Sequence, residues 1–490
     1  MNIASRVLRS SSLSAAVQLF IKLIDLGTLI CLARLLNPAD FGLIAVAMSI
    51  ILITEAILEL PVSSVLLLHR NIDDDAVATG FTLGLLRAML VAAIAIAAGY
   101  VLSVSVSDRR VFWLVAVLSL SPCLRGLISP RMVVFALDQN FKPQARMDLL
   151  AKVVASTVAV GSAYSTRSYW AIAAGVVLGP AIMVAYSFYV APFRLRWTLA
   201  RWHLFSSYVG WNMASQTIRA VNWQLDRVLL PRQVTLESFG KYAMASDIVA
   251  VPVKALVQPL ASPLLAGFSA IDPLDHSRLG RAYLKSIDAV LSLVVPVYIL
   301  LAVYSDVLVP VILGNAWRDA SNIVTTLSLI TIISLIPTAF GSLSMVCRRP
   351  DLIVRLAAVE FVPKVVAMLA LIPIFGINGA MLAQLIAAVI ASGYSLFLAR
   401  FLVQLDLKIQ LQTIFWPLAA AAAMLLIMAI VQPVAVQLLP FTSVGQMLCG
   451  ALLGVFSYLA AIVWMWLLRG RPDGLITSVL QRFEWAQRKP

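Results

Sequence analysis

The stretch FGLIAVAMSI at residues 41–50 returns as FGKYAMASDI at residues 239–248, with five identities in ten positions at a constant offset. Each copy comes shortly after a helix end that reads Arg-Leu-Leu or Arg-Val-Leu-Leu. In each case it opens the second helix of a set of six. Two similar lobes in a parallel pseudo-repeat are therefore predicted, with a membrane site between them.

The composition places these lobes in a lipid bilayer. Hydrophobic residues make up 61% of the 490 residues and charged residues only 12%, whereas soluble domains carry about 25% charged residues. A hydrocarbon core about 30 Å thick needs roughly 20 mostly apolar residues per helix, and runs of that length recur. The short alternating segments of an outer-membrane barrel do not recur. The composition excludes a soluble globular enzyme and predicts an all-α polytopic membrane protein.

Apolar length and Gly, Pro and charge punctuation predict about fourteen membrane helices. The N-terminal lobe, 1–200, is expected to contain helices 12–34, 41–66, 78–104, 111–135, 147–165 and 168–190. The C-terminal lobe, 201–403, is expected to contain helices 205–230, 238–268, 283–305, 320–346, 352–372 and 378–403. Segment 404–470 adds helices 412–432 and 444–468, and 471–490 is expected to form a cytoplasmic amphipathic tail.

The basic residues predict the orientation. Of the 37 Lys and Arg residues, twenty fall in the segments predicted to be inner and seven in the outer ones. The positive-inside rule then places both termini in the cytoplasm. The same distribution accounts for most of the net charge of +14, so no nucleic-acid partner is expected.

A polar face runs along helix 205–230. It consists of Asn212, Gln216, Arg219, Asn222 and Asp226, with Arg227 beside it. Their spacing of three and four residues puts them on one side of a helix. A lipid-facing helix does not tolerate such a row, so this face is predicted to line a wet or protein-filled interior. The alternative is a set of hydrogen bonds between helices plus one Asp–Arg pair.

The matched first helix of the other lobe, 12–34, repeats the spacing with Gln18, Lys22, Asp25 and Thr28. Either Lys22 and Asp25 face the same interior, or they neutralise each other. Helix 238–268 continues the pattern with Asp247, Lys254, Gln258 and Ser262.

Helix 41–66 contains Glu55 and Glu59, one turn apart. Two ionised carboxylates at this spacing repel each other, so one of them can be protonated near neutral pH in a low-dielectric setting. The pair is a candidate for H⁺ or Na⁺ coupling, and Asp25, Asp226 and Asp247 are further candidates for coupling or gating. Alternatively, Glu59 reaches lipid headgroups or pairs with a basic neighbour.

Cations inside the predicted helices suggest an anionic cargo. Arg87, Arg125 and Arg219 are hard to place against lipid, whereas Arg131, Arg355 and Lys152 lie nearer helix ends and are expected to snorkel. Lys364 has Glu360 one turn away, so an ion pair there is as plausible as a ligand contact. Guanidinium groups match phosphate oxygens. The candidate substrate ligands are Arg219, Arg227, Arg87, Arg125, Asn222, Gln216 and Lys22.

The sequence offers little for catalysis. It lacks the GxxxxGK[ST] phosphate loop of ATP-hydrolysing proteins, and its three His and four Cys residues show no metal-ligand spacing. We expect no cofactor, no metal and no enzymatic activity.

Several motifs in order resemble a known family. They are ARLLNPADFG at 33–42, YWA at 169–171, Asn222 with Asp226 and Arg227, FGKY at 239–242, and the prolines Pro252, Pro259 and Pro263. Together they resemble the bacterial polysaccharide flippases, the lipid-linked oligosaccharide translocases of the multidrug/oligosaccharidyl-lipid/polysaccharide exporter superfamily. The resemblance covers about residues 12–405. Leu60-Pro61 departs from it, because relatives commonly have a glycine there.

The resemblance implies a two-lobed bundle that carries an undecaprenyl-pyrophosphate-linked repeat unit from the cytoplasmic to the periplasmic leaflet by alternating access. It also implies a cation-lined cavity, and the polar motif of its seventh helix falls on Asn222, Asp226 and Arg227. Expected partners are the lipid-linked oligosaccharide, membrane lipids, H⁺ or Na⁺, and glycan polymerase and export machinery. The expected location is the bacterial inner membrane.

Two other functions stay open. An ion-coupled drug or metabolite exporter of the same superfamily would need a net acidic cavity for cationic compounds. A membrane glycan polymerase or ligase would usually present a large outer loop with catalytic Arg or His, and the outer loops here are short.

Overall fold

The computed structural model of the chain describes residues 3–60, 62, 65–66, 73–138, 140–194, 196–438 and 443–468. In some helical stretches, including 3–16, 206–216 and position 219, only the backbone is described. Every regular element within these ranges is a helix, which confirms the all-α class. The predicted tail at 471–490 lies outside the described residues.

The chain forms two compact units, Met1–Ala243 and Met244–Pro490. The first contains α1 (Ile3–Leu35), α2 (Pro38–Ile57), α4 (Asp74–Ser105), α5 (Arg109–Leu118), α6 (Leu120–Gly126), α7 (Met132–Leu137), α8 (Lys142–Thr166), α9 (Trp170–Val190), α10 (His203–Leu229) and η1 (Leu230–Arg232). Helix α11 (Leu236–Pro252) crosses the boundary between the units. The first unit therefore includes α10, the expected first helix of the C-terminal lobe, and the two-lobe division stays a prediction.

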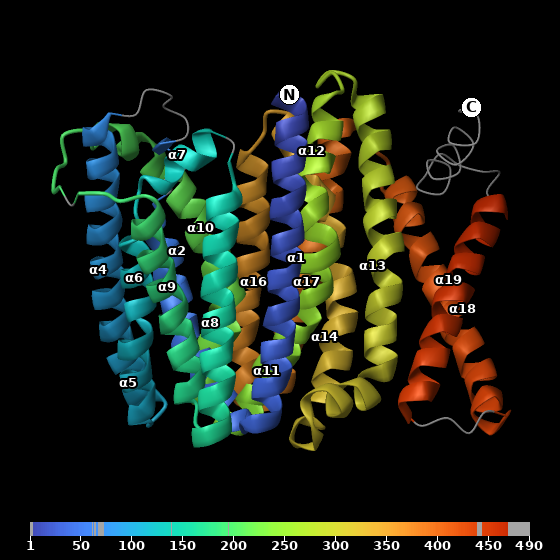
Figure 1. The fold of residues 1–490 in the computed structure, drawn as a ribbon. Coiled ribbons are helices and arrows are strands. Elements are labelled where there is room, and N and C mark those ends of the chain that lie inside the picture. The colour runs from blue at the N-terminus through green and yellow to red at the C-terminus, as the bar shows by residue number, and fades with distance from the viewer. Residues whose placement is uncertain are drawn as a thin grey trace. The chain divides into compact units, whose positions relative to one another are not determined.

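The second unit continues the chain to its C-terminal helices. It contains η2 (Val253–Val257), η3 (Gln258–Leu260), α12 (Ala261–Ser269), α13 (His276–Leu313), η4 (Asn315–Trp317), α14 (Ala320–Ser334), η5 (Ile336–Ala339), α15 (Phe340–Val346), α16 (Asp351–Phe375), α17 (Ile377–Val403), α18 (Leu407–Leu438) and α19 (Ser443–Leu468). Within this unit, α16 packs along α17, and α18 packs against both α13 and α19; the crossing of α18 and α19 is visible in Figure 1.

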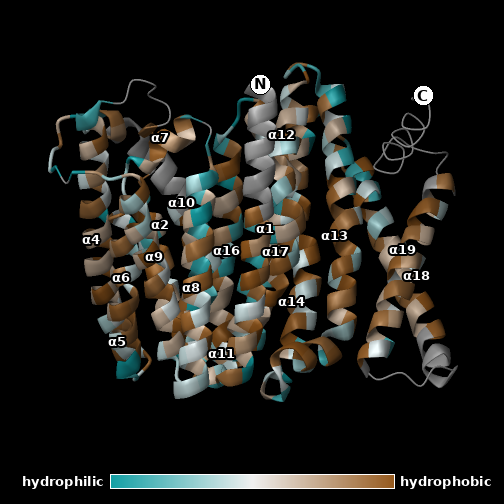
Figure 2. Ribbon diagram, viewed as in Figure 1, coloured by the Kyte–Doolittle hydropathy of each residue, from teal (hydrophilic) through white to brown (hydrophobic). Residues whose placement is uncertain are grey.

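Eleven helices in the described part of the chain are long and apolar enough to cross a membrane, as the hydrophobic colouring of the ribbon illustrates (Figure 2). The chain is a multi-pass membrane protein. The three remaining expected spans correspond to α1, to α5, α6 and α7 together, and to α10. Polar residues lower the hydropathy of α10, and the expected span 111–135 is broken into three short helices. The number fourteen stays a prediction.

Most helix limits agree with the sequence-based ones, but α2 ends early. The apolar pattern predicts a helix to residue 66, whereas α2 ends at Ile57, followed by a turn at Leu58 and irregular backbone at Glu59 and Leu60. A helix that ends within an apolar stretch leaves its last carbonyl groups without intrahelical partners, so they need donors from elsewhere.

Small residues let helices of the first unit approach closely. Leu32 of α1 and Leu36, just after this helix, pack against Ala159 and Ala163 of α8 in a buried cluster. On α9, a Cβ at Gly175 would lie 3.1 Å from the carbonyl oxygen of Ala155. Such small-residue contacts are typical of membrane helix pairs, where van der Waals packing rather than the hydrophobic effect drives association.

The two copies of the repeated stretch meet each other. A Cβ at Gly42 of α2 would overlap the carbonyl oxygen of Leu236 and lie 3.1 Å from the amide nitrogen of Gly240. A Cβ at Gly240 would in turn overlap the carbonyl oxygen of Pro38. The starts of α2 and α11 therefore lie backbone against backbone, which only residues without a side chain allow.

Three consecutive aspartates at the start of α4 bind three basic residues. Asp73 pairs with Arg201 at 2.7 Å. Asp74 pairs with Arg131 at 3.0 Å, and Asp75 with Arg196 at 3.8 Å.

Asp73 also caps α4, because its carboxylate accepts a hydrogen bond from the amide of Ala76 at 2.8 Å. The Arg201 guanidinium, helped by this amide, holds the pKa of the Asp73 carboxyl below its usual value. These contacts hold the segment that leads into α10 against the start of α4.

Candidate functional site

Four of the predicted site residues come together in the first unit, from α2, the segment that follows it, α4 and α6. We call Glu55, Glu59, Arg87 and Arg125 the arginine–glutamate cluster. Its clearest contact is an ion pair of 3.0 Å between the Arg125 guanidinium and the Glu55 carboxylate. Arg125 also donates to the hydroxyl of Ser121 at 3.3 Å. The side chain of Arg125 is 45% exposed and that of Glu55 is 17% exposed, so the pair is partly accessible.

Arg87 holds the early end of α2. Its guanidinium donates to the carbonyl oxygens of Leu58 and Glu55, the latter at 3.1 Å. These are among the last carbonyls of the helix, where the helix dipole also favours a positive charge. Arg87 therefore supplies the donors that the end of α2 lacks.

The charges in the arginine–glutamate cluster are balanced. Arg87 lies within electrostatic range of Glu55, Glu59 and Arg125, so two cations stand among two carboxylates. The sequence predicted a surplus of positive charge that included Arg87 and Arg125, and here their charge is offset by Glu55 and Glu59. The same contacts place Glu55 and Glu59 beside arginines rather than alone with each other.

A second ionic group lies between α1 and α8. Asp25 forms an ion pair with Lys152, and both side chains are about a third or more exposed. Lys22, one turn earlier on α1, is exposed. Asp25 therefore pairs with Lys152 across the helices rather than with Lys22, and Lys152 is engaged in this pair instead of simply snorkelling.

Helix α8 carries a polar row that the sequence analysis missed. Gln144, Asp148, Lys152 and Ser156 follow one another at intervals of four. Gln144 donates to the Asp148 carboxylate at 3.0 Å, and hydrophilic colour is visible along part of α8 in Figure 2. The four-residue spacing indicates that these residues share one face of the helix. The surrounding alanines and valines keep the mean hydropathy of the segment high, so hydropathy alone does not reveal the row.

On α10, the predicted polar face ends in buried groups. Asp226 and Arg227 are 4% and 8% exposed. The Asp226 carboxylate accepts a hydrogen bond of 2.7 Å from the hydroxyl of Tyr242, and Asn222 is half-buried. The side chains of Asn212, Gln216 and Arg219 lie outside the described part of the structure, so their roles stay predictions.

The second unit adds further ionic groups. Asp247 on α11 is half-buried and Lys254 in η2 is exposed. Lys364 of α16 is buried, with 8% exposure.

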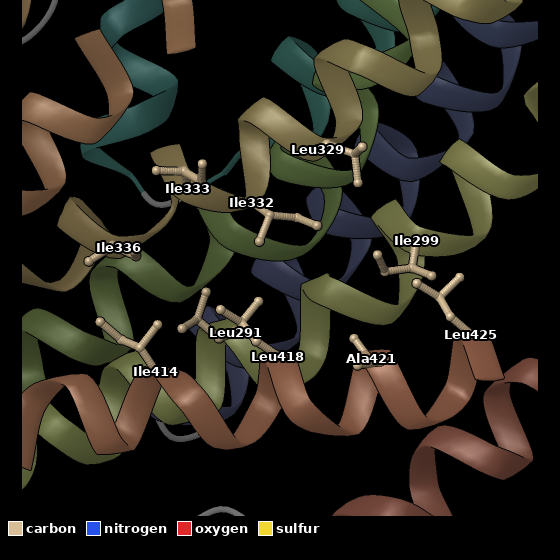
Figure 3. Close-up of a pocket in the computed structure, with 11 residues that line it drawn as sticks. Leu291, Ile299, Leu329, Ile332, Ile333, Ile336, Ile414, Leu418, Ala421 and Leu425 are labelled. Atoms are coloured by element: carbon tan, nitrogen blue, oxygen red, sulfur yellow. The ribbon is translucent and has the colours of Figure 1, made fainter. Parts of the chain in front are cut away.

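The same unit also contains a cavity of about 300 Å³ between α13, α14, η5 and α18. Figure 3 shows that aliphatic side chains such as Leu291, Ile299 and Leu418 line it. Such a lining suits hydrocarbon and offers nothing to a phosphate.

Comparison with known proteins places the chain in a family. Residues 31–322 match the model of a family described as polysaccharide biosynthesis protein. The succinoglycan biosynthesis transport protein ExoT of Rhizobium meliloti is 21% identical over 302 residues, 61% of this chain and 60% of ExoT. The lipopolysaccharide biosynthesis protein WzxC of Escherichia coli is 22% identical over 369 residues, 72% of each chain. The match thus spans only about three fifths of the length of ExoT.

The fold resembles that of a solved lipid transporter. The structure of the lipid II flippase MurJ in an inward closed conformation superimposes with a TM-score of 0.73 and 13% identity, covering 93% of this chain and 98% of MurJ. At this identity the likeness concerns the fold alone. Because the family model covers more than half of the sequence, the chain belongs to the polysaccharide biosynthesis protein family.

Proposed function

We propose that the protein is a flippase that moves an undecaprenyl-pyrophosphate-linked oligosaccharide repeat unit from the cytoplasmic to the periplasmic leaflet by alternating access. The product would serve surface or exopolysaccharide biosynthesis. Membership of the family supports this function, as do relatives named for succinoglycan transport and lipopolysaccharide biosynthesis. In this proposal the protein lies in the bacterial inner membrane with both termini in the cytoplasm.

One observation carries the proposal: charged groups lie within the helices that would cross the membrane and are accessible there. The Asp25–Lys152 pair is partly exposed and Lys22 is exposed beside it. A charge at bilayer depth is costly unless it faces protein, water or a ligand. A polar transport path explains these exposed groups, whereas lipid contact does not.

In this proposal the pyrophosphate is bound by cations and amides of α1 and α10. Lys22 is an exposed cation of α1, and Arg227 lies at the end of α10. Arg219, Gln216 and Asn222 complete the proposed set on α10. Guanidinium groups bind phosphate oxygens in a two-point geometry, and the amide groups would donate to the remaining oxygens.

The arginine–glutamate cluster supplies a way to couple this binding to an ion. Glu55 occupies Arg125 at 3.0 Å in this structure. Protonation of Glu55 would remove its charge and release Arg125 for the incoming pyrophosphate, and deprotonation would return Arg125 to the carboxylate. Arg87 would stay on the end of α2 throughout, beside Glu59. Asp25, Asp226 and Asp247 are the further candidate gating groups.

A deletion strain provides the test. We expect it to lose surface polysaccharide and to accumulate the lipid-linked precursor, and the wild-type gene to restore both. Arg219→Ala and Lys22→Gln should fail to restore polysaccharide although the proteins reach the membrane. Lys408→Gln removes an exposed charge at the start of α18 and is the matched control. Normal polysaccharide from the deletion strain would refute the function, and normal output from Arg219→Ala would remove that residue from the mechanism.

A further inference from the structure

One candidate membrane-spanning segment, most of which lies in the second unit, is broken near its middle. Residues Leu236–Ser269 form a single candidate span of 34 residues. Within it, α11 gives way to the π-helix η2 at Val253, then to the 3-10 helix η3 at Gln258, before α12 resumes at Ala261. We call residues 253–260 the helix break. A change of helix type leaves some backbone groups without their usual intrahelical partners, and at membrane depth these groups need partners from protein, water or a ligand.

Prolines explain why the helix changes its hydrogen-bonding pattern here. Pro252 precedes the break and Pro259 lies within it. Proline has no N–H group, so Pro252 cannot donate to the carbonyl of Ile248, four residues earlier. Pro259 likewise cannot donate to the carbonyl of Ala255. The π-helix absorbs this loss by shifting to bonds one residue longer, an arrangement that is frequent at functional sites.

A buried tyrosine supports the break from a neighbouring helix. Tyr298 of α13 is fully buried, and its hydroxyl donates a hydrogen bond of 2.7 Å to the carbonyl oxygen of Val249, one turn before the break. Tyr283, on the same helix and equally buried, has a hydroxyl without a hydrogen-bond partner among the described residues. Tyr298 is thus specifically placed to hold the broken conformation.

The break presents polar side chains outward. Lys254 and Gln258, four residues apart and so about one turn of this helix, are both exposed. The ammonium group of Lys254 stands near the middle of the span, where snorkelling to either headgroup region is longest. An exposed charge at that depth needs water or a counter-charge.

We propose that the helix break is a binding site for the phosphoryl group of an anionic lipid, with the ammonium of Lys254 and the amide of Gln258 as its ligands. This inference rests on the proposed flippase function and assigns it a phosphate-contacting site in the second unit. A metal cation would also suit freed carbonyls, but the adjacent ammonium repels it. Tyr298 acts as a positioning residue because it holds the backbone rather than touching the lipid.

Binding of a matched pair of probes tests the site. Farnesyl pyrophosphate and farnesol share the same hydrocarbon and differ in charge, and their affinities can be measured with purified protein in nanodiscs. Wild type should bind the pyrophosphate more tightly. Lys254→Gln should weaken that binding about 10- to 100-fold, as expected for loss of a charge-assisted hydrogen bond, and leave farnesol binding unchanged. Lys254→Arg should retain most of the affinity, and Lys408→Gln all of it.

Tyrosine variants separate positioning from general stability. Tyr298→Phe should reduce the preference for pyrophosphate over farnesol, whereas Tyr283→Phe should leave it unchanged. Equal pyrophosphate affinity in wild type and Lys254→Gln would overturn the site. If the wild-type gene restores polysaccharide in the deletion strain while the site fails this test, the flippase function stands without it. If the gene also restores nothing, the proposed function falls as well.

Discussion

Gly42 of α2 and Gly240 of α11 lie backbone to backbone, with the position of a Cβ on Gly42 only 3.1 Å from the amide nitrogen of Gly240. The two glycines occupy equivalent places in the repeated stretch. The repeat therefore has a structural role, because its two copies contact each other directly. The backbones can approach this closely only because both positions are glycine.

Alanine at either glycine should destabilise this contact. Gly42→Ala or Gly240→Ala places a methyl group on a backbone carbonyl that cannot move like a side chain, and such overpacking costs about 1–3 kcal/mol. Thermal unfolding of the purified protein should show a lower midpoint for both variants. Gly27→Ala on α1, where a Cβ meets nothing within 4 Å, should leave the midpoint unchanged or raise it. A raised midpoint for Gly42→Ala would contradict the contact.

Arg125 and Glu55 should show coupled effects on stability. Arg125→Gln leaves Glu55 without its ion-pair partner, and Glu55→Gln does the same to Arg125. The decreases in unfolding free energy of the two single variants should therefore add up to more than the decrease of the double variant. Residues in contact show interaction energies of about 0.5–3 kcal/mol, and the exposure of Arg125 places this pair toward the low end. A double-mutant cycle on unfolding free energies measures the term, and strict additivity would argue against the pair.

Asp25 and Lys152 should depend on each other for insertion. Asp25→Asn or Lys152→Met leaves one unpaired charge at bilayer depth, at a cost of about 2.5–3.5 kcal/mol on insertion scales, so each should lower the amount of protein in the membrane. The double variant carries neither charge and should recover that amount. Immunoblots of membrane fractions give the answer. Polysaccharide output should stay low in the double variant if the pair also serves transport.

The Asp73–Arg201 pair should make stability depend on pH on the acid side. The pKa of Asp73 is lowered in the folded protein by Arg201, so the pair stabilises the fold above the unfolded-state pKa of about 3.9. This contribution is lost as the pH falls through the lower folded-state value. Asp73→Asn keeps the helix cap and removes the charge. The difference in melting temperature between wild type and variant should shrink as the pH falls from about 6 toward 3, and a constant difference would contradict the assignment.

The sequence was informative about the helices because apolar length and Pro or Gly punctuation act locally. The limits of α16 and α17 follow closely from the predicted segments 352–372 and 378–403. The early end of α2 could not be predicted in the same way. It depends on Arg87, 29 residues away from Leu58, which replaces the missing intrahelical donors.

The site was harder to predict because helix periodicity shows which residues share a helix face but not which faces of different helices pack against each other. The sequence identifies Glu55 and Glu59 as a carboxylate pair, yet their neutralisation by Arg87 and Arg125 depends on how α2, α4 and α6 pack. Asp25 had a nearer candidate in Lys22, and the structure pairs it with Lys152 of α8 instead. Partners far apart in sequence leave no periodic signal.

Helix α2 is fixed at both of its ends, at its start by the glycine contact with α11 and at its end by the Arg87 guanidinium on its final carbonyls. Sliding along its own axis would break both attachments at once. Any change of state that involves α2 is therefore a rotation about its glycine end or a rigid-body movement together with α4, rather than a translation along the helix axis.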